Sequence, residues 1–234
     1  MKRALLDALL AAKALRVPAA VVTDTASGAQ ALVEPEGESG DLALTGAERQ
    51  AVLARLHDDT GGMLDAAEDV RPLFVDVPAP PPRLVIVGAV HIAQSLIPMA
   101  VMTGYDVVVV DPREAFATPE RFSGVTLTHD WPDEALEALR PDARTAIVTL
   151  THDPKLDDPA LRIALRSPAF YVGALGSRKT HAKRVERLEA AGLSAGEIGR
   201  LHAPVGLAIG ARSPAEIAVS ILAQITAVRR GAQP

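Results

Sequence analysis

The chain has 234 residues, of which 48% are hydrophobic and 23% are charged. That much apolar material excludes global disorder and is enough for one or two folded domains. Only 3% of the residues are aromatic and the formal net charge is −5, which argues against a nucleic-acid binder that stacks bases and attracts phosphates.

Residues 1–78 predict a small α+β domain with an acidic surface. They hold 7 basic and 13 acidic side chains, whereas residues 79–234 hold 17 and 16. The predicted elements are, in chain order, a helix over 5–15, strands over 19–23 and 29–33, a helix begun by a capping box at 45–48, and a strand over 70–77. The proline-rich segment 78–82 cannot continue a helix or a central strand, so we place the domain boundary after residue 78.

Residues 79–234 alternate between strands and helices. The apolar runs at 84–87 and 107–110 are typical of strands buried on both faces of a sheet. The other predicted elements are a helix over 91–103, a strand over 125–127, a helix around 136–139, a strand over 145–149, a helix opened by Asp158-Pro159, a strand over 170–172, a basic helix over 177–190 and a helix capped at 213–216. This alternation predicts an α/β fold with a Rossmann-like parallel sheet and helices on both faces.

The segment Val87–Ala93 directly follows the first of these strands, where a dinucleotide-binding fold has G-x-G-x-x-G/A. Gly88 permits the tight turn, but Val90 stands where a glycine would let the backbone approach a pyrophosphate. Two interpretations remain open, an unusual nucleotide or pterin site and a Rossmann-type fold that has lost dinucleotide binding. His91 opens the following helix, either as a ligand-facing residue or only as a cap or packing residue.

Two charged residues follow the second of these strands. Asp111 falls 23 residues after Gly88, at the position from which an acid can bind a ribose. Arg113 offers the alternative of neutralising a phosphate. Both residues are therefore candidates for contact with a nucleotide or pterin.

Thr151-His152-Asp153 follows the strand at 145–149, at the edge where open parallel sheets bind ligands. His152 beside Asp153 offers acid–base or metal-ligand chemistry. The alternative is that Asp153-Pro154 forms a turn and His152 is a solvated loop residue. One His and one Asp do not define a metal-binding set, so we assign no metal site.

Gly176-Ser177-Arg178-Lys179 follows the strand at 170–172 and opens the basic helix. Free backbone N–H groups, the helix dipole, the Ser177 hydroxyl and two cations favour an anion site. The alternative is a solvated basic helix that faces an acidic partner. The sequence contains neither G-x-S-x-G nor H-E-x-x-H, and we assign no catalytic residue.

Together these segments resemble the XdhC/CoxI family of accessory proteins for xanthine dehydrogenase and related molybdenum hydroxylases. The match covers residues 70–234 and rests on the motifs at 73–77, 87–93, 110–113, 151–153, 171–178 and 204–212. The resemblance implies a Rossmann-like C-terminal domain and an accessory or chaperone role, in which the protein binds molybdenum cofactor and aids its sulfuration or insertion. Family members often have glycine where this chain has Val90, and many carry a Gly-Gly-Cys type motif that this chain lacks.

The resemblance also implies a cofactor and partners. The cofactor is a molybdopterin-type molybdenum cofactor, with the mononucleotide and dinucleotide forms both open. The partners are a molybdenum hydroxylase of the xanthine dehydrogenase type and a cysteine desulfurase that supplies sulfur. The residues expected to contact the cofactor are Gly88, Val90, His91, Asp111, Arg113, Thr151, His152, Asp153, Gly176, Ser177, Arg178 and Lys179.

Two other functions remain open, a docking protein with a dead nucleotide site and an NAD(P)-dependent oxidoreductase. No apolar stretch reaches about 18 residues and the N-terminus does not read as a signal peptide, so we expect no membrane partner and a cytoplasmic location. The apolar stripe of the last helix is expected to pack on the sheet or in a homodimer; it comprises Ile217, Ile221, Ile225 and Val228. Because the chain has no cysteine, disulfides and thiolate metal sites are excluded.

Overall fold

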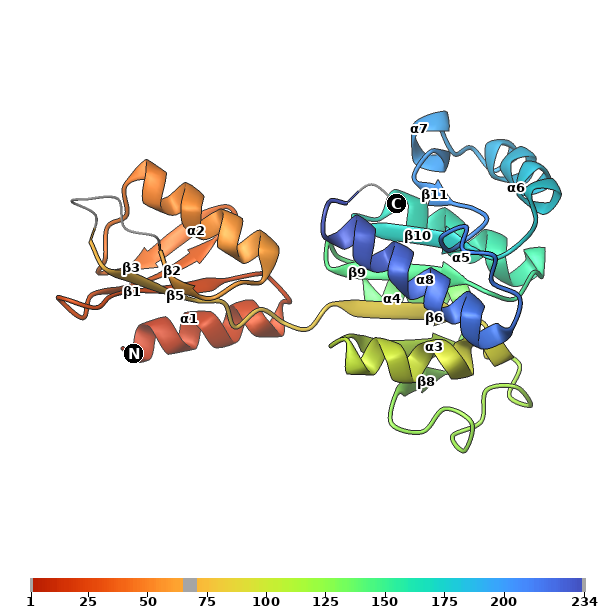
Figure 1. Ribbon diagram of the computed structural model, residues 1–234, viewed down its shortest axis with the longest axis horizontal. Coiled ribbons are helices and arrows are strands. Elements are labelled where there is room, and N and C mark those ends of the chain that lie inside the picture. Colours follow the sequence, from red (N-terminus) through yellow and green to blue (C-terminus); the bar gives the residue numbers. More distant parts are fainter. Residues whose placement is uncertain (1, 65–70, 233–234) are drawn as a thin grey trace. The chain divides into compact units, whose positions relative to one another are not determined.

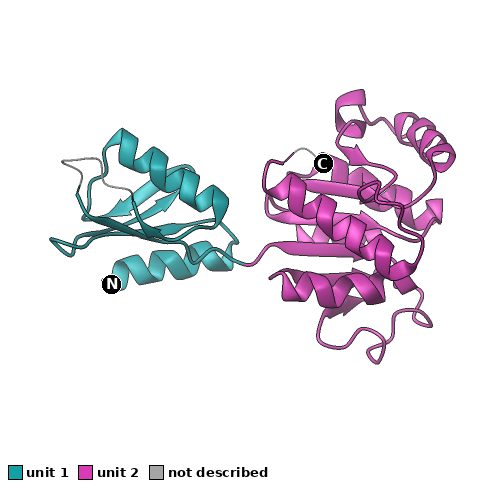
Figure 2. Ribbon diagram, viewed as in Figure 1, with its two compact units in different colours: residues 1–80 teal, residues 81–234 magenta. Residues whose placement is uncertain are grey.

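The computed structural model of the chain describes residues 2–64 and 71–232. It contains two compact units, Met1–Pro80 and Pro81–Pro234 (Figure 2). Each unit has its own sheet and its own buried apolar clusters. Among the described residues, none of the helices combines the length and hydropathy needed to cross a membrane.

The N-terminal unit is an antiparallel sheet covered by one helix on each face (Figure 1). Val21 and Leu32 face the first helix, whereas Val22 and Val33 face the second. The sheet order is β3-β2-β1-β5-β4. The elements are α1 (Arg3–Ala14), β1 (Ala20–Asp24), β2 (Gln30–Glu34), β3 (Gly37–Gly40), α2 (Gly46–Asp58), β4 (Gly62–Met63) and β5 (Leu73–Asp76).

Most predicted elements of this unit are confirmed. The capping box at Thr45 and Glu48 is present at the start of α2. The strand predicted over 70–77 spans Leu73–Asp76 in the structure, and residue 70 lies outside the described residues. The short strands β3 and β4 were not predicted.

The C-terminal unit contains a six-stranded parallel sheet in the order β11-β10-β9-β6-β7-β8. The strand order reverses between β6 and β9, which is where sheets of this type bind ligands. The elements are β6 (Arg83–Val87), α3 (His91–Met102), β7 (Asp106–Val110), β8 (Thr126–Thr128), α4 (Pro132–Leu139), β9 (Thr145–Thr149), α5 (Pro154–Arg166), β10 (Tyr171–Ala174), α6 (Arg178–Ala190), α7 (Ala195–Ile198), β11 (Leu201–His202) and α8 (Pro214–Arg229).

Helices cover both faces of this sheet, as the α/β prediction required (Figure 1). Successive side chains of a strand point to opposite faces. Leu84 and Ile86 therefore pack with α3 and α8, whereas Val85 and Val87 pack with α4 and α5. The stripe of the last helix packs on its own sheet, with Ile221 and Ile225 fully buried there.

The predicted start of α5 was wrong. The helix begins at Pro154 with Asp153 as its N-cap, and Pro159 lies inside it. The sequence carries two Asp-Pro pairs five residues apart, and both satisfy the rule of Asp at the N-cap and Pro at the first helical position. The earlier pair begins the helix, because the Asp153 carboxylate accepts the Lys155 N–H at 2.9 Å. The Asp158 carboxylate instead pairs with Arg187 of α6.

Candidate functional site

The carboxyl ends of β6 and β9 lie side by side, so the loops that follow them meet at the point where the strand order reverses. Gly88 has a φ of +115°, a value that favours glycine. A Cβ at this position would lie 2.7 Å from the Cγ2 atom of Thr151. Glycine at position 88 is therefore required both by the turn and by the contact between the two loops.

The loop after β6 leads directly into α3. Val90 is the N-cap of α3 with a φ of −98° and makes no side-chain cap hydrogen bond. Its side chain is half-buried and packs against the apolar cluster beneath α3. The valine therefore introduces no backbone strain here. His91 is exposed at the first position of the helix, and the N-cap is Val90.

Asp111 holds this loop from the end of β7. Its buried carboxylate accepts the Ala89 N–H at 2.8 Å and two side-chain hydrogen bonds from Arg113, at 2.8 and 2.7 Å. It also accepts the backbone N–H of Arg113 at 3.0 Å. We call this arrangement the Asp111 clamp. Burial alone would raise the pKa of Asp111, but the hydrogen bonds from Arg113 and Ala89 hold it below its ordinary value.

The clamp changes what its two residues can offer a ligand. Both oxygens of Asp111 already accept hydrogen bonds, and the charge of Arg113 is compensated by the carboxylate. The Arg113 guanidinium also lies over the Phe116 ring, 4.6 Å from its centroid. The geometry therefore gives both residues a part in ordering the loop after β6.

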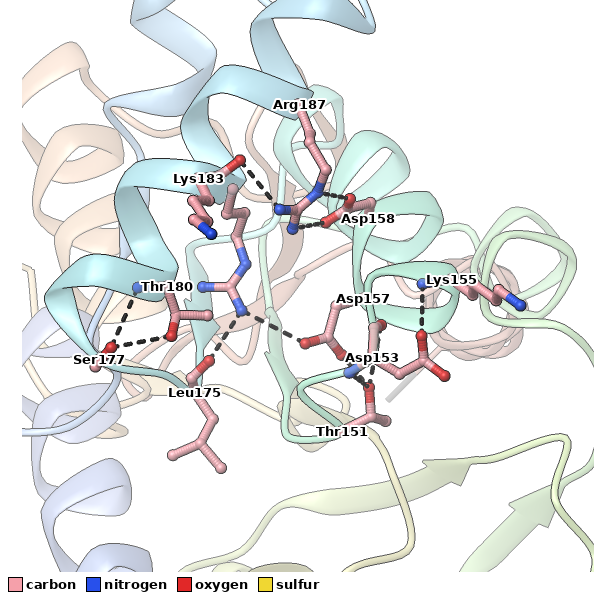
Figure 3. A network of polar contacts seen from close by, with 11 residues as sticks. Thr151, Asp153, Lys155, Asp157, Asp158, Leu175, Ser177, Thr180, Lys183 and Arg187 are labelled. Atoms are coloured by element: carbon pink, nitrogen blue, oxygen red, sulfur yellow. Dashed lines mark hydrogen bonds and ion pairs between the residues drawn. The ribbon is translucent and has the colours of Figure 1, made fainter.

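The loop after β9 is organised by the Thr151 hydroxyl (Figure 3). This hydroxyl donates to the Asp157 carboxylate at 2.6 Å and accepts the Asp153 N–H at 3.0 Å. Asp153 caps α5 and Pro154 is its first residue, so Asp153-Pro154 begins a helix instead of forming the turn of the alternative interpretation. His152 is exposed, with a φ of +60°. Among the described residues, no group of three or more His, Cys, Asp or Glu is placed to hold a metal ion.

The third predicted segment begins α6 after β10. Ser177 is the N-cap and its hydroxyl accepts the Thr180 N–H at 3.1 Å. Gly176 has a φ of +144°, and a Cβ there would lie 3.1 Å from the Cγ2 atom of Thr180. Arg178 and Lys179 are exposed in the first turn, and no acidic residue stands beside them there.

A pocket of about 300 Å³, which we call the α5–α6 pocket, lies beside these last two segments. It brings two predicted residues, His152 and Lys179, to one place. The other lining residues were not predicted as a site: Pro154, Asp157, Thr180, Lys183, Arg184 and Arg187.

Arg184 lies at the centre of this unpredicted set. Its side chain is only 2% exposed, and Nη2 donates to the Leu175 carbonyl at 2.9 Å. The same atom lies 3.5 Å from the Asp157 carboxylate, whose side chain is 1% exposed. One signal in the sequence points to its burial, because Leu188 lies one helical turn after Arg184 and is buried.

The chain is similar to several curated proteins. It is 37% identical over 164 residues to "Uncharacterized protein YqeB" of Escherichia coli strain K12, a match that covers 68% of this chain and 30% of that protein. It is 33% identical over 147 residues to "Molybdenum cofactor insertion chaperone PaoD" of the same strain, covering 63% of this chain and 40% of PaoD. It is 33% identical over 160 residues to a probable xanthine dehydrogenase subunit of Bacillus subtilis strain 168, covering 68% of this chain and 46% of that protein. The chain thus spans less than half the length of these relatives.

A solved structure shares the fold. The crystal structure described as a xanthine dehydrogenase from Bacillus halodurans aligns with a TM-score of 0.70 and 24% identity, covering 98% of this chain and 66% of that chain. Residues 84–225 match the family described as the XdhC Rossmann domain. Because this match includes more than half of the chain, the chain belongs to the XdhC Rossmann-domain family.

Proposed function

We propose that this chain acts in the maturation of molybdenum hydroxylases of the xanthine dehydrogenase type, as an accessory protein that binds molybdopterin-type cofactor as its cargo. Membership of the XdhC family supports this proposal. So does the similarity to a protein named as a molybdenum cofactor insertion chaperone. In this proposal the chain holds the cofactor and aids its sulfuration or its insertion into the hydroxylase.

The observation that carries the proposal is the meeting of the loops after β6 and β9 at the reversal of strand order. Gly88 and Thr151 are in contact there. The loop between β10 and α6 begins at the same sheet edge, because β10 runs parallel to β9. Ligands of open parallel sheets bind at this position.

Each of the three loops has a proposed part in holding the cofactor. The backbone at Gly88 and Val90, together with His91, lines one side, and Asp111 and Arg113 keep that loop ordered. Thr151 and Asp153 shape the second loop, from which His152 would donate a hydrogen bond to an oxo or sulfur ligand of the molybdenum. In the third loop, Gly176, Ser177, Arg178 and Lys179 would hold a phosphate at the start of α6.

In this proposal the sulfur for sulfuration does not come from a cysteine of these residues. These 234 residues contain no cysteine, so no thiol of this chain can carry a persulfide. We therefore propose that a cysteine desulfurase supplies the sulfur and that this chain presents the cofactor to it. The hydroxylase then receives the completed cofactor.

The Asp111 clamp counts against NAD(P) bound in the usual Rossmann manner. An NAD-binding Rossmann site uses the acid after the second strand to hold a ribose hydroxyl. Here Asp111 already accepts hydrogen bonds from Arg113 and from the Ala89 backbone. A ribose would have to replace the Arg113 contacts, which are charge-assisted and therefore strong.

The test is to purify the chain from cells that synthesise molybdenum cofactor and to measure molybdenum and oxidised-pterin fluorescence per chain. We expect both at close to one per chain. Cells that lack cofactor synthesis provide the control, and the protein from them should give neither signal. A Thr151→Val variant, which keeps the methyl group and loses the hydroxyl, should retain less of both.

Two results would contradict the proposal. Protein that carries neither molybdenum nor pterin, but co-purifies with a molybdenum hydroxylase, would indicate a docking protein. Protein that carries neither, and whose melting temperature rises with NAD(P), would indicate an oxidoreductase.

A further inference from the structure

We infer that the α5–α6 pocket is a binding site for a phosphate or diphosphate group, with Arg184 as its buried anchor. The pocket is lined by Lys179, Lys183, Arg184 and Arg187 from α6 and by His152 from the loop after β9. Among the described residues that line it, Asp157 is the one carboxylate. Lining of this kind attracts an anion.

The cations of the pocket differ in how far their charge is compensated. Arg187 is paired with Asp158, whose Oδ1 atom accepts from Nη2 at 3.0 Å (Figure 3). Lys179 and Lys183 are exposed at the mouth of the pocket. The two lysines and Arg184 together outweigh the single charge of Asp157, which leaves a net positive pocket.

The unsatisfied guanidinium of Arg184 is the strongest indication of a ligand. Its Nε and Nη1 atoms are buried without a hydrogen-bond partner among the described residues. Its contact with Asp157 is long, at 3.5 Å, and involves Nη2 alone. Buried polar groups are nearly always hydrogen-bonded in folded proteins, so an unsatisfied guanidinium indicates a missing acceptor. A phosphate presents acceptor oxygens that match the planar fork of an arginine.

The first turn of α6 places further donors beside the same side chain. A Cβ at Gly176 would lie 3.8 Å from the Nη1 atom of Arg184. The unpartnered nitrogen therefore lies close to the start of the helix, where backbone N–H groups and the helix dipole favour an anion. The helix terminus and the buried guanidinium are independent features that point to the same class of ligand.

The size of the pocket indicates how much of a ligand it takes. Pockets for whole drug-sized ligands range from about 300 to 1,000 Å³, and this one has about 300 Å³. A phosphate or diphosphate fits that space, with His152 of the loop after β9 at its lining. The identification of the ligand with a molybdopterin rests on the proposed function, whereas the pocket rests on its own geometry.

Isothermal titration of the whole chain with inorganic diphosphate, and separately with inorganic phosphate, tests the inference. Wild-type protein should bind at least one of the two in a saturable manner with one site per chain. Stronger binding of diphosphate would indicate a dinucleotide or other diphosphate ligand, and stronger binding of phosphate a monoester. The double variant Lys179→Ala, Lys183→Ala should bind at least about tenfold more weakly, because it loses two charge-assisted contacts.

Lys155→Ala is the matched control, since Lys155 is an exposed lysine of the neighbouring helix that does not line the pocket. It should bind within about twofold of wild type. Arg184→Met should abolish binding. If the Arg184→Met protein does not fold, the test rests on the Lys179→Ala, Lys183→Ala variant. Absence of saturable binding in wild type, or equal loss in the double variant and in Lys155→Ala, would overturn the inference. Molybdenum content is measured separately, so failure of the phosphate site is distinguishable from failure of the proposed function.

Discussion

Two buried carboxylates of the C-terminal unit are paired with arginines in opposite ways. Asp111 is fully buried and receives four hydrogen bonds, at 2.7–3.0 Å, from Arg113 and from the Ala89 backbone. Asp157 is equally buried, but its arginine lies 3.5 Å away and keeps two nitrogens unpartnered among the described residues. The arginine of the first pair is partly exposed, whereas Arg184 is almost completely buried.

The two pairs have different consequences for the chain around them. A pair whose hydrogen bonds are all made orders the chain around it, as the Asp111 clamp orders the loop after β6. A pair with unmade hydrogen bonds retains the cost of removing charges from water without full compensation. The second arrangement is favourable when a ligand completes it, and the predictions below separate the two cases.

The largest expected effect is the loss of the Asp111 carboxylate. Asp111→Ala should lower the free energy of unfolding of the C-terminal unit by about 3 kcal/mol, because two backbone N–H groups and the Arg113 guanidinium lose their acceptor. Asp157→Asn should cost only about 1 kcal/mol, since the amide oxygen still accepts from the Thr151 hydroxyl. Urea unfolding measures both values, and equal losses would remove the distinction between the two pairs.

The next effect concerns removal of both charges of a pair. We expect Asp157→Asn with Arg184→Met to lie within about 1 kcal/mol of wild type, because replacing a poorly satisfied buried pair by apolar groups is often neutral. Asp111→Asn with Arg113→Met should lose about 2 kcal/mol, since one amide oxygen cannot replace both carboxylate oxygens. The same unfolding experiment compares the two double variants. A double variant at Asp157 and Arg184 that is the less stable of the two would contradict the comparison.

The two carboxylates should also give opposite pH dependences. The pKa of Asp111 lies below the ordinary value of 3.8, so its contribution to the free energy of unfolding is present above that pH and is lost as the pH falls through the folded value. Burial raises the pKa of Asp157 above 3.8, so the folded state holds a proton that the unfolded state releases. Stability should therefore decline as the pH rises from 3.8 through that raised pKa.

Unfolding free energies measured between about pH 3 and 7 test this pattern. Asp157→Asn should remove the decline with rising pH, and Asp111→Asn should weaken the loss in acid. If stability still declines with rising pH in Asp157→Asn, the decline belongs to another titratable group.

The smallest expected effect is a dependence of stability on the anion present, through the Asp157–Arg184 pair. Sulfate, a tetrahedral dianion like phosphate, should stabilise wild-type protein by about 1 kcal/mol more than chloride at equal ionic strength, provided that it reaches several times its Kd. Sulfate also stabilises proteins generally, so the Lys179→Ala, Lys183→Ala variant serves as the control. The thermal shift should be smaller in that variant, and equal shifts would count against a specific site.

The fold was largely predictable because local patterns determine most of its elements. The apolar runs of β6 and β7 are buried on both faces of a parallel sheet, and such strands are visible in the sequence without knowledge of their neighbours. The capping boxes at Thr45 and Ser213 are present as expected. The strands β3, β4 and β11 were missed, because strands of two to four residues depend on pairing rather than on their own pattern.

The candidate site was predicted less completely. His152 and Lys179 were singled out, and both line the α5–α6 pocket. Arg184 and Asp157 were missed, since a charged residue on a helix usually faces solvent and a basic run reads as a solvated surface. In the sequence of α6 the inward face is marked by Leu188, four residues after Arg184, and the packing of that face against α5 comes from the tertiary structure.

Thr151 connects the loop that Asp111 holds with the pair of Asp157 and Arg184. Its methyl group lies over Gly88, while its hydroxyl donates to Asp157 and accepts from the Asp153 backbone. Valine at this position would preserve the methyl contact without the hydroxyl, and serine would preserve the hydroxyl without the methyl. Threonine is the one common amino acid that carries both groups on Cβ, so it alone makes both the methyl contact with Gly88 and the hydroxyl hydrogen bonds in the loop after β9.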